Sequence, residues 1–160
     1  MASKIKTIFF EPRTSIEQVE EGTSLAPKFN EDGLIPVTTT EWETGEVLMM
    51  GFMNPDALIR TIKTGFAHYW SRSRAKIWKK GETSGMYQSV KELRIDDDQD
   101  AVWMRVTLAG DKASCHVGYK SCFYRLIPLG ESPVKLQFKE RKKVFDPKVK
   151  YGDIPNPTKL

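Results

Sequence analysis

Both cysteines of this 160-residue chain, Cys115 and Cys122, lie in one short segment, with one of its two histidines, His116, between them. An acidic run, Asp96-Asp97-Asp98-Gln99-Asp100, precedes this segment. Thiolates and imidazoles are preferred ligands of Zn²⁺, and carboxylates are preferred by Mg²⁺. Zinc lowers the pKa of a bound water to about 7, and a nearby imidazole can transfer the proton. The residue types therefore favour a metal-dependent hydrolase that activates water.

The acidic run has a spacing that suits a hard cation. On an extended strand Asp96, Asp98 and Asp100 would share one face and Asp97 would point to the other. Three carboxylates on one face repel one another, and oxygen ligands at alternate positions suit Mg²⁺ or Ca²⁺. An exposed acidic turn between two strands explains the same spacing equally well.

The cysteine pair does not have the C-x₂-C spacing of common structural zinc sites. Two thiolates need at least one more protein ligand, and the chain has no third cysteine, so Asp97 and His116 are both candidates. Neighbouring residues of a strand point in opposite directions, so Cys115 and His116 would bind one ion together only if the chain bends. The alternative is a pair of buried cysteines that serve as small apolar side chains.

Residues 71–85 form a basic, polar stretch, Ser-Arg-Ser-Arg-Ala-Lys-Ile-Trp-Lys-Lys-Gly-Glu-Thr-Ser-Gly. Guanidinium groups and glycine-rich backbone bind phosphate well. Trp78 could stack on a base, and a nucleic-acid groove would use similar ingredients. The mixture of Arg, Ser, Trp and Gly favours phosphate binding over a solvated basic loop.

The elements that must position these residues are mostly strands. Asn54 is a good helix N-cap, Pro55 suits the first helical position and Gly65 the position after the last turn, so we expect a helix at about 54–64. Expected strands cover residues 34–41, 46–53, 66–71, 86–95, 101–108 and 122–128, with a hairpin turn at 43–45 and a long polar loop between 71 and 86. The pattern predicts an α+β fold with mostly antiparallel strands.

Three segments are expected along the chain: an N-terminal extension (1–28) with a short helix near Thr14-Ser15, a central domain (29–128), and a basic, proline-containing tail (129–160) that hugs the surface or is mobile. The 39% apolar and 29% charged residues fit one globular domain. The longest apolar run, 47–53, is too short to span a membrane, and no apolar leader is visible, so we expect a cytoplasmic protein. The lysine-rich part of the tail could contact RNA, although a solvated tail is the simpler interpretation.

From about Gly33 to Leu126 the sequence resembles the phosphoribosyl-AMP cyclohydrolases of histidine biosynthesis. The resemblance rests on Gly-Leu-Ile-Pro-Val (33–37), Thr-Gly-Glu-Val-Leu-Met (44–49), Ser-Arg-Ser-Arg (71–74), Trp-Lys-Lys-Gly-Glu-Thr-Ser-Gly (78–85), Gln88, the acidic run, Cys-His (115–116) and Ser-Cys-Phe-Tyr-Arg (121–125). Several motifs in the right order make the resemblance specific.

The resemblance implies an intertwined homodimer with a roll-like or grasp-like sheet and sites at the subunit interface. It implies Zn²⁺ and Mg²⁺ as cofactors and the opening of the N1–C6 bond of 1-(5-phosphoribosyl)-AMP by water. Zinc would be bound by Cys115 and Cys122, magnesium by Asp96, Asp98 and Asp100, and His116 would transfer protons. The residues implied to contact the substrate are Ser71, Arg72, Ser73, Arg74, Trp78, Lys80, Gly81, Glu82, Thr83, Ser84, Gly85 and Gln88.

The sequence departs from the family pattern at two positions. The family has Asp-Cys-Asp-x-Asp, whose cysteine is the third zinc thiolate, from the neighbouring subunit, and here that position is Asp97. A carboxylate is a harder ligand, so we expect weaker zinc affinity and more tolerance for manganese or iron. The family commonly has His or Asn where Met86 stands. A divergent paralogue acting on another purine-like nucleotide, or a non-catalytic nucleic-acid-binding relative, is the alternative hypothesis.

Overall fold

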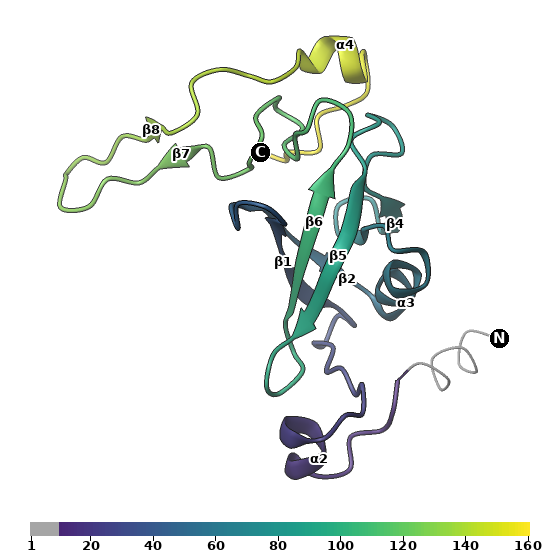
Figure 1. Ribbon diagram of the computed structural model, residues 1–160. Helices are drawn as coiled ribbons and strands as arrows, with labels where there is room; N and C mark the ends of the chain where they lie inside the picture. The colour runs from purple at the N-terminus through teal and green to yellow at the C-terminus, as the bar shows by residue number, and fades with distance from the viewer. Residues whose placement is uncertain (1–9) are drawn as a thin grey trace.

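The computed structural model describes residues 10–160, and its centre is a four-stranded sheet. The strands are β1 (Ile35–Glu41), β2 (Val47–Met53), β5 (Gln88–Ile95) and β6 (Val102–Leu108), in the order β2-β1-β6-β5 (Figure 1). β1 pairs antiparallel with β2, and β5 with β6, whereas β1 and β6 run parallel. The α+β class with mostly antiparallel strands is therefore confirmed, and the central parallel pairing is an addition to it.

Helix α3 (Pro55–Thr64) begins and ends at the residues that its capping signals indicate. The Asn54 side chain accepts a hydrogen bond from the backbone N–H of Ala57 at 2.8 Å. Gly65 adopts a left-handed conformation, with φ of 71°, and its N–H donates to the carbonyl of Thr61. The predicted helix at 54–64 is therefore confirmed, and so is the hairpin of β1 and β2 that precedes it.

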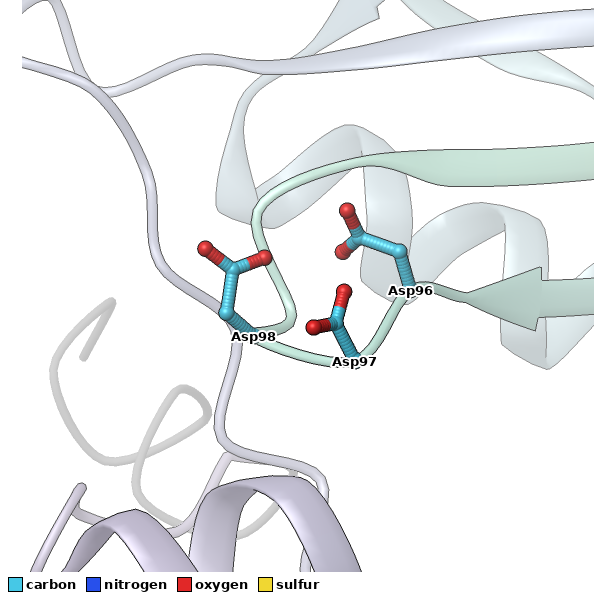
Figure 2. A group of neighbouring side chains, drawn as sticks. All are labelled: Asp96, Asp97 and Asp98. Carbon is cyan, nitrogen blue, oxygen red and sulfur yellow. The ribbon is translucent and has the colours of Figure 1, made fainter.

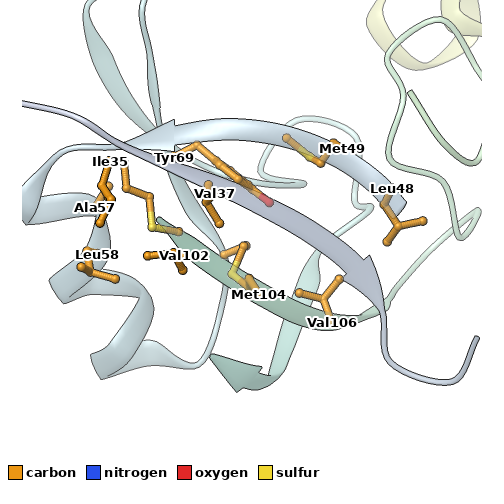
Figure 3. Close-up of a cluster of buried hydrophobic side chains, with 12 residues drawn as sticks. Ile35, Val37, Leu48, Met49, Ala57, Leu58, Tyr69, Val102, Met104 and Val106 are labelled. Carbon is orange, nitrogen blue, oxygen red and sulfur yellow. The ribbon is translucent and has the colours of Figure 1, made fainter. Parts of the chain in front are cut away.

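The hydrophobic core lies where α3 and β3 (His68–Ser71) pack against the sheet. Residues of β6 alternate as expected, because Val102, Met104 and Val106 are buried while Trp103 between them is partly exposed. Figure 3 shows these side chains together with those of β1, β2 and α3. The buried cluster consists of Ile35, Val37, Leu48, Met49, Met53, Ala57, Leu58, Ala67, Tyr69, Val102, Met104 and Val106.

The expectation of one long loop between residues 71 and 86 is wrong, because β4 (Lys76–Lys79) lies within it. β4 pairs antiparallel with β3, and the ring of Trp78 stacks on that of Tyr69 with 5.1 Å between centroids. Lys76 and Lys79 at the ends of β4 and Lys80 after it give this segment the polar composition of a loop, which is why the sequence did not predict the strand. Most of the residues predicted to bind phosphate therefore lie in the turn between β3 and β4 and in the loop that follows β4.

The terminal segments contain little regular structure. Helix α2 (Ile16–Glu21) confirms the short helix expected near residue 14, with Ser15 as N-cap. The first nine residues of the predicted extension lie outside the described residues. The strand expected at 122–128 is reduced to β7 (Arg125–Leu126), which pairs with β8 (Gln137–Phe138), and α4 (Pro147–Tyr151) follows. Within the described residues, every helix is too short or too polar to traverse a lipid bilayer.

Candidate active site

The loop that follows β6 brings the two thiols together. It folds back on itself, because Ser114 N–H donates to the carbonyl of Lys120 at 2.8 Å and Cys115 N–H to that of Tyr119 at 3.2 Å. Cys122 N–H donates to the carbonyl of Leu48 in β2 at 2.7 Å, which anchors the end of the loop to the sheet. Residues 114–122, here called the cysteine loop, are thus fixed by backbone hydrogen bonds at both ends.

The two thiols form a coupled pair of free cysteines. The Cys122 thiol hydrogen-bonds to the sulfur of Cys115 and lowers the pKa of Cys115 to about 6, an effect that the backbone of Val117 and the Lys80 ammonium assist. The same hydrogen bond, together with burial, raises the pKa of Cys122. The pair therefore holds one proton near neutral pH and offers one thiolate. Soft sulfur ligands of this kind favour Zn²⁺.

The side chain of Lys80 places a positive charge beside the thiols. Its ammonium donates a hydrogen bond of 2.6 Å to the carbonyl of Ser114 at the start of the cysteine loop. Burial lowers the pKa of Lys80, and the two cysteines act in the opposite direction. A nearly buried ammonium needs such partners, because an unpaired buried charge is costly. Lys80 thus both holds the loop and favours the thiolate form of the pair.

His116 lines the same site with an imidazole that burial keeps neutral. Burial is the largest cause that lowers the pKa of His116, and the positive charges of Lys80 and Arg74 lower it further. The Asn156 side chain, which lies beside the ring, raises the pKa in part. The buried Nε2 of His116 has no hydrogen-bond partner among the described residues. A neutral ring with an unused nitrogen can accept a proton.

A cavity of about 650 Å³ joins the cysteine loop to the β3–β4 hairpin and the loop after it. Most of the residues predicted to contact a substrate line this cavity, together with His116 and Cys122. They are Ser71, Arg72, Ser73, Arg74, Trp78, Lys80, Gly81, Glu82, Thr83 and Ser84. The structure thus brings the basic stretch, the imidazole and one thiol to a single cavity, in which arginine and lysine side chains outnumber the one carboxylate, Glu82.

Gln88 and Gly85, also predicted to contact a substrate, are not among the residues that line this cavity. Gln88 is fully buried and accepts a hydrogen bond of 2.6 Å from the Tyr69 hydroxyl. Its amide N–H donates to the Ser114 hydroxyl at 3.1 Å. Because these contacts use its side chain, Gln88 holds the start of the cysteine loop against the core.

The carboxylates of Asp96, Asp97 and Asp98 gather at the turn between β5 and β6 (Figure 2). One oxygen from each lies within 4.8 Å of the others. The expected alternation of faces is wrong here, because β5 ends at Ile95 and the chain turns, so Asp97 joins its neighbours. Desolvation and the charges of Asp98 and Asp96 raise the pKa of the nearby Asp100. The donor set fits a hard divalent cation.

The N-terminal segment holds this acidic turn through the buried side chain of Gln99. The Gln99 amide donates to the carbonyls of Val19 and Ser24 at 3.0 and 3.1 Å. Its carbonyl oxygen accepts from the N–H of Ala26 at 2.8 Å. Gln99 adopts a positive φ of 58°, which costs about 1 kcal/mol for a residue with a side chain. These three hydrogen bonds offset that cost and fix the turn.

The acidic turn and the cysteine loop lie at opposite ends of β6 (Figure 1). A strand of this length spans roughly 20 Å. None of the four aspartates lines the cavity that contains His116 and Cys122. One chain therefore does not bring all the predicted metal ligands to one site.

The sequence pattern gave no indication of two further parts of the cavity wall. Residues 49–52 of β2 line it, and so do eight residues of the tail, namely Pro147, Lys148, Tyr151, Gly152, Ile154, Pro155, Asn156 and Pro157. The tail, expected to hug the surface or be mobile, packs on the cysteine loop and so follows the first of these two expectations. The apolar residues of the tail follow neither a helical nor a strand period, so the sequence pattern did not predict that the tail packs here.

The fold and this set of side chains define a metal-dependent hydrolase with a cationic cavity for a phosphorylated ligand. The family model of phosphoribosyl-AMP cyclohydrolase matches residues 49–124. The chain is 48% identical over 145 residues to the phosphoribosyl-AMP cyclohydrolase of Rhizobium leguminosarum bv. trifolii, covering 91% of this chain and 97% of the relative. The enzyme of the same name from Rhodopseudomonas palustris is 52% identical over 138 residues, 85% of this chain and 90% of the relative. The chain belongs to the phosphoribosyl-AMP cyclohydrolase family.

Proposed function

We propose that this protein hydrolyses 1-(5-phosphoribosyl)-AMP and opens its adenine ring between N1 and C6, a step of histidine biosynthesis. The observation that carries the proposal is the single cavity in which a basic hairpin, a neutral imidazole and a cysteine thiol meet. A volume of about 650 Å³ is in the range of cavities that hold small-molecule ligands. Family membership supplies the identity of the substrate.

The cationic residues of the cavity bind the phosphates of the substrate in this proposal. The guanidinium of Arg72 lies 4.2 Å from the centre of the Phe52 ring, which holds its plane in one orientation. Arg74 lines the same wall, and Ser71, Ser73, Thr83 and Ser84 add hydroxyl groups. Trp78 lies against Tyr69 and offers an aromatic surface to a purine.

His116 transfers the proton of the attacking water, because its ring is neutral and its Nε2 has no hydrogen bond to a described residue. Cys115, Cys122 and Asp97 are the proposed zinc ligands, and Asp96, Asp98 and Asp100 the proposed magnesium ligands. The thiol pair fits a thiophilic cation, since one thiolate is favoured there, and the acidic turn fits a hard cation. When bound, these ions polarise water and balance negative charge.

We further propose a homodimer in which the partner's Asp97 approaches the cysteine pair of this chain. Support comes from the position of the acidic turn, which lies a full strand length away from Cys115 and Cys122 in the same chain. A twofold axis that places one end of β6 against the opposite end of its copy would create two equivalent sites. Two further points remain predictions from the sequence: that the protein does not bind nucleic acid, and that it is cytoplasmic.

Metal content and turnover measured on one sample test the proposal. We expect about one zinc per subunit, by elemental analysis, and ring opening of phosphoribosyl-AMP with Mg²⁺ present, followed by chromatography of the product. His116→Ala is expected to lower kcat about 10²- to 10⁴-fold while zinc content stays unchanged.

Failure to open the ring when Zn²⁺ and Mg²⁺ are both supplied would contradict the proposed substrate. Bound metal without turnover would instead favour another purine-like nucleotide, to be identified by screening related nucleotides on the same sample. A His116→Ala variant that loses zinc together with activity would place the imidazole among the metal ligands and remove it from proton transfer.

A further inference from the structure

The cavity has two facing walls that come from distant parts of the chain. One wall consists of residues 71–84, around β3 and β4, and the other of residues 147–157, which include α4. In Figure 1 the yellow C-terminal segment passes α4 and returns to the loop that follows β6. The side chain of Asn156 in this segment reaches the imidazole of His116. The C-terminal wall thus extends to the reactive end of the cavity.

Specific contacts hold the C-terminal wall, and the segment that leads into it, against the cysteine loop and the turn that precedes this loop. The carboxylate of Glu140 accepts hydrogen bonds from the N–H groups of Lys120 and Ser121 at 2.9 and 3.1 Å. Val144 N–H donates to the carbonyl of Gly118 at 2.7 Å. Beyond that point, Lys150 forms an ion pair of 2.7 Å with Asp111. These contacts precede and flank Lys148 and hold its backbone in place.

The lysines near the cavity differ in whether their charges are already engaged. Lys79 lies over the rings of Phe66 and Tyr87, at 4.2 and 4.9 Å from their centres, and Lys80 donates to the Ser114 carbonyl. Lys150 is paired with Asp111.

Lys148 is different, because its side chain is exposed, lines the cavity, and its ammonium contacts no acceptor among the residues described. The guanidinium of Arg74, on the facing wall, is likewise without an acceptor in the described part of the chain.

The substrate under the proposed function has two phosphates, each on a ribose, attached at opposite ends of one purine. A ligand of this shape matches a cavity with cations available on both walls, Arg72 and Arg74 on one and Lys148 on the other, because each phosphate can meet a separate charge. If all recognition came from the β3–β4 wall, both phosphates would have to reach the same side.

We propose that residues 147–157 form the second wall of the substrate site and that Lys148 binds one of the two substrate phosphates. This inference rests on the proposed function and adds a specificity-determining residue to it. Arg74 binds the other phosphate from the facing wall.

Replacement of Lys148 tests the inference. We expect Lys148→Ala to raise KM for phosphoribosyl-AMP roughly three- to thirty-fold with kcat within about twofold, the range for loss of one partly exposed cation at a phosphate. Lys148→Glu is expected to raise KM further, and Lys148→Arg to restore most of the affinity. Lys142→Ala is the matched control, because Lys142 is an exposed lysine of the same tail that does not line the cavity.

A second measurement separates this inference from the proposed reaction. Calorimetry records binding of phosphoribosyl-AMP to metal-free protein, in which no turnover occurs, for wild type, Lys148→Ala and Lys142→Ala. Weaker binding for Lys148→Ala alone supports the second wall, even if the wild type shows no turnover and the proposed reaction fails. If the wild type turns over and binds substrate while Lys148→Ala matches Lys142→Ala in both assays, the inference is overturned and the proposed function stands.

Discussion

The acidic turn and the cysteine loop lie at opposite ends of β6, and a different terminal segment of the chain packs against each. At the acidic turn, Gln99 is buried and bonds to three backbone groups of the N-terminal segment. At the cysteine loop, the C-terminal tail contributes the Glu140 carboxylate, which accepts from two backbone N–H groups, and the backbone N–H of Val144, which donates to the Gly118 carbonyl. The buried Gln99 side chain therefore makes most of the contacts at the acidic turn, whereas a carboxylate and the close approach of two backbones hold the cysteine loop. Substitutions at the acidic turn and at the cysteine loop are therefore expected to destabilise the protein for different physical reasons.

The largest expected effect tests whether the two ends serve one site. Cys122→Ser removes a proposed zinc ligand and Asp98→Asn a proposed magnesium ligand. A homodimer of either variant is therefore expected to have a kcat at least about 10³-fold lower. Co-expressed with two different tags, the variants would form mixed dimers in which one of two composite sites has all its ligands. We expect the mixture to regain about a quarter of wild-type activity, measured as ring opening of phosphoribosyl-AMP.

If each chain contained a complete site, the mixture would stay as inactive as its components. The control is a mixture of two tagged Cys122→Ser chains, in which every site lacks the same ligand.

Gln99→Ala should weaken the acidic end strongly. It removes three hydrogen bonds to the carbonyls of Val19 and Ser24 and the N–H of Ala26, each with a contribution of about 1 kcal/mol. We expect a loss of about 2–3 kcal/mol in the free energy of unfolding, measured in urea. Gln137→Ala, at an exposed glutamine, is the control and is expected to change stability by less than about 0.5 kcal/mol. Equal effects of the two substitutions would contradict the role of Gln99.

Gly118→Ala tests the close approach at the cysteine end. Gly118 has φ of 109°, and a Cβ there would lie 2.6 Å from the carbonyl oxygen of Phe145. Gly130→Ala is a matched control, because Gly130 also has a positive φ, of 76°, but its Cβ would meet nothing within 4 Å. We expect Gly130→Ala to cost about 1 kcal/mol and Gly118→Ala about 1–3 kcal/mol more.

Limited proteolysis adds a second measurement, since only Gly118→Ala is expected to expose the tail to cleavage. A Gly118→Ala variant with the stability and cleavage pattern of Gly130→Ala would show that the tail does not depend on this contact.

The smallest expected effect concerns pH. The Lys120 ammonium, which donates to Glu41 at 2.7 Å, lowers the pKa of Glu41, and the Thr44 hydroxyl assists. A lowered carboxyl pKa stabilises the fold above the ordinary value of 4.5 and is lost as the pH falls through the lower, folded-state pKa. We expect Glu41→Gln to lose about 1 kcal/mol or less near pH 7 and almost nothing near pH 3, by urea unfolding of metal-free protein. The exposed Glu43→Gln should differ from wild type at neither pH.

Local signals in the sequence predicted the parts of the fold that depend on local interactions. The N-cap at Asn54, the glycine after α3 and the alternation in β6 each act within a few residues, and the structure confirms all three. The parallel pairing of β1 with β6 joins strands about sixty residues apart, and no local pattern encodes it.

The candidate site divides in the same way. Clusters of chemically distinctive residues identified the basic stretch, His116 and the two cysteines, and the structure places the basic stretch, His116 and Cys122 at one cavity. Gln88 lies in a recognised motif, yet it is buried, because a motif does not reveal whether a polar side chain faces a ligand or the core. The sequence did not predict Lys148 and Asn156 as site residues, because only the packing of the tail brings them to the cavity.

The position of the second wall in the sequence has a consequence for biosynthesis. Residues 147–157 are synthesised after the residues of the sheet and of α3, and they supply one side of the cavity. The sheet, α3 and both groups of predicted metal ligands precede them in the chain, so a nascent chain can fold its core and still lack an enclosed pocket. The cavity therefore gains its C-terminal side only after residues 147–157 have been added, which separates folding of the scaffold from completion of the cavity.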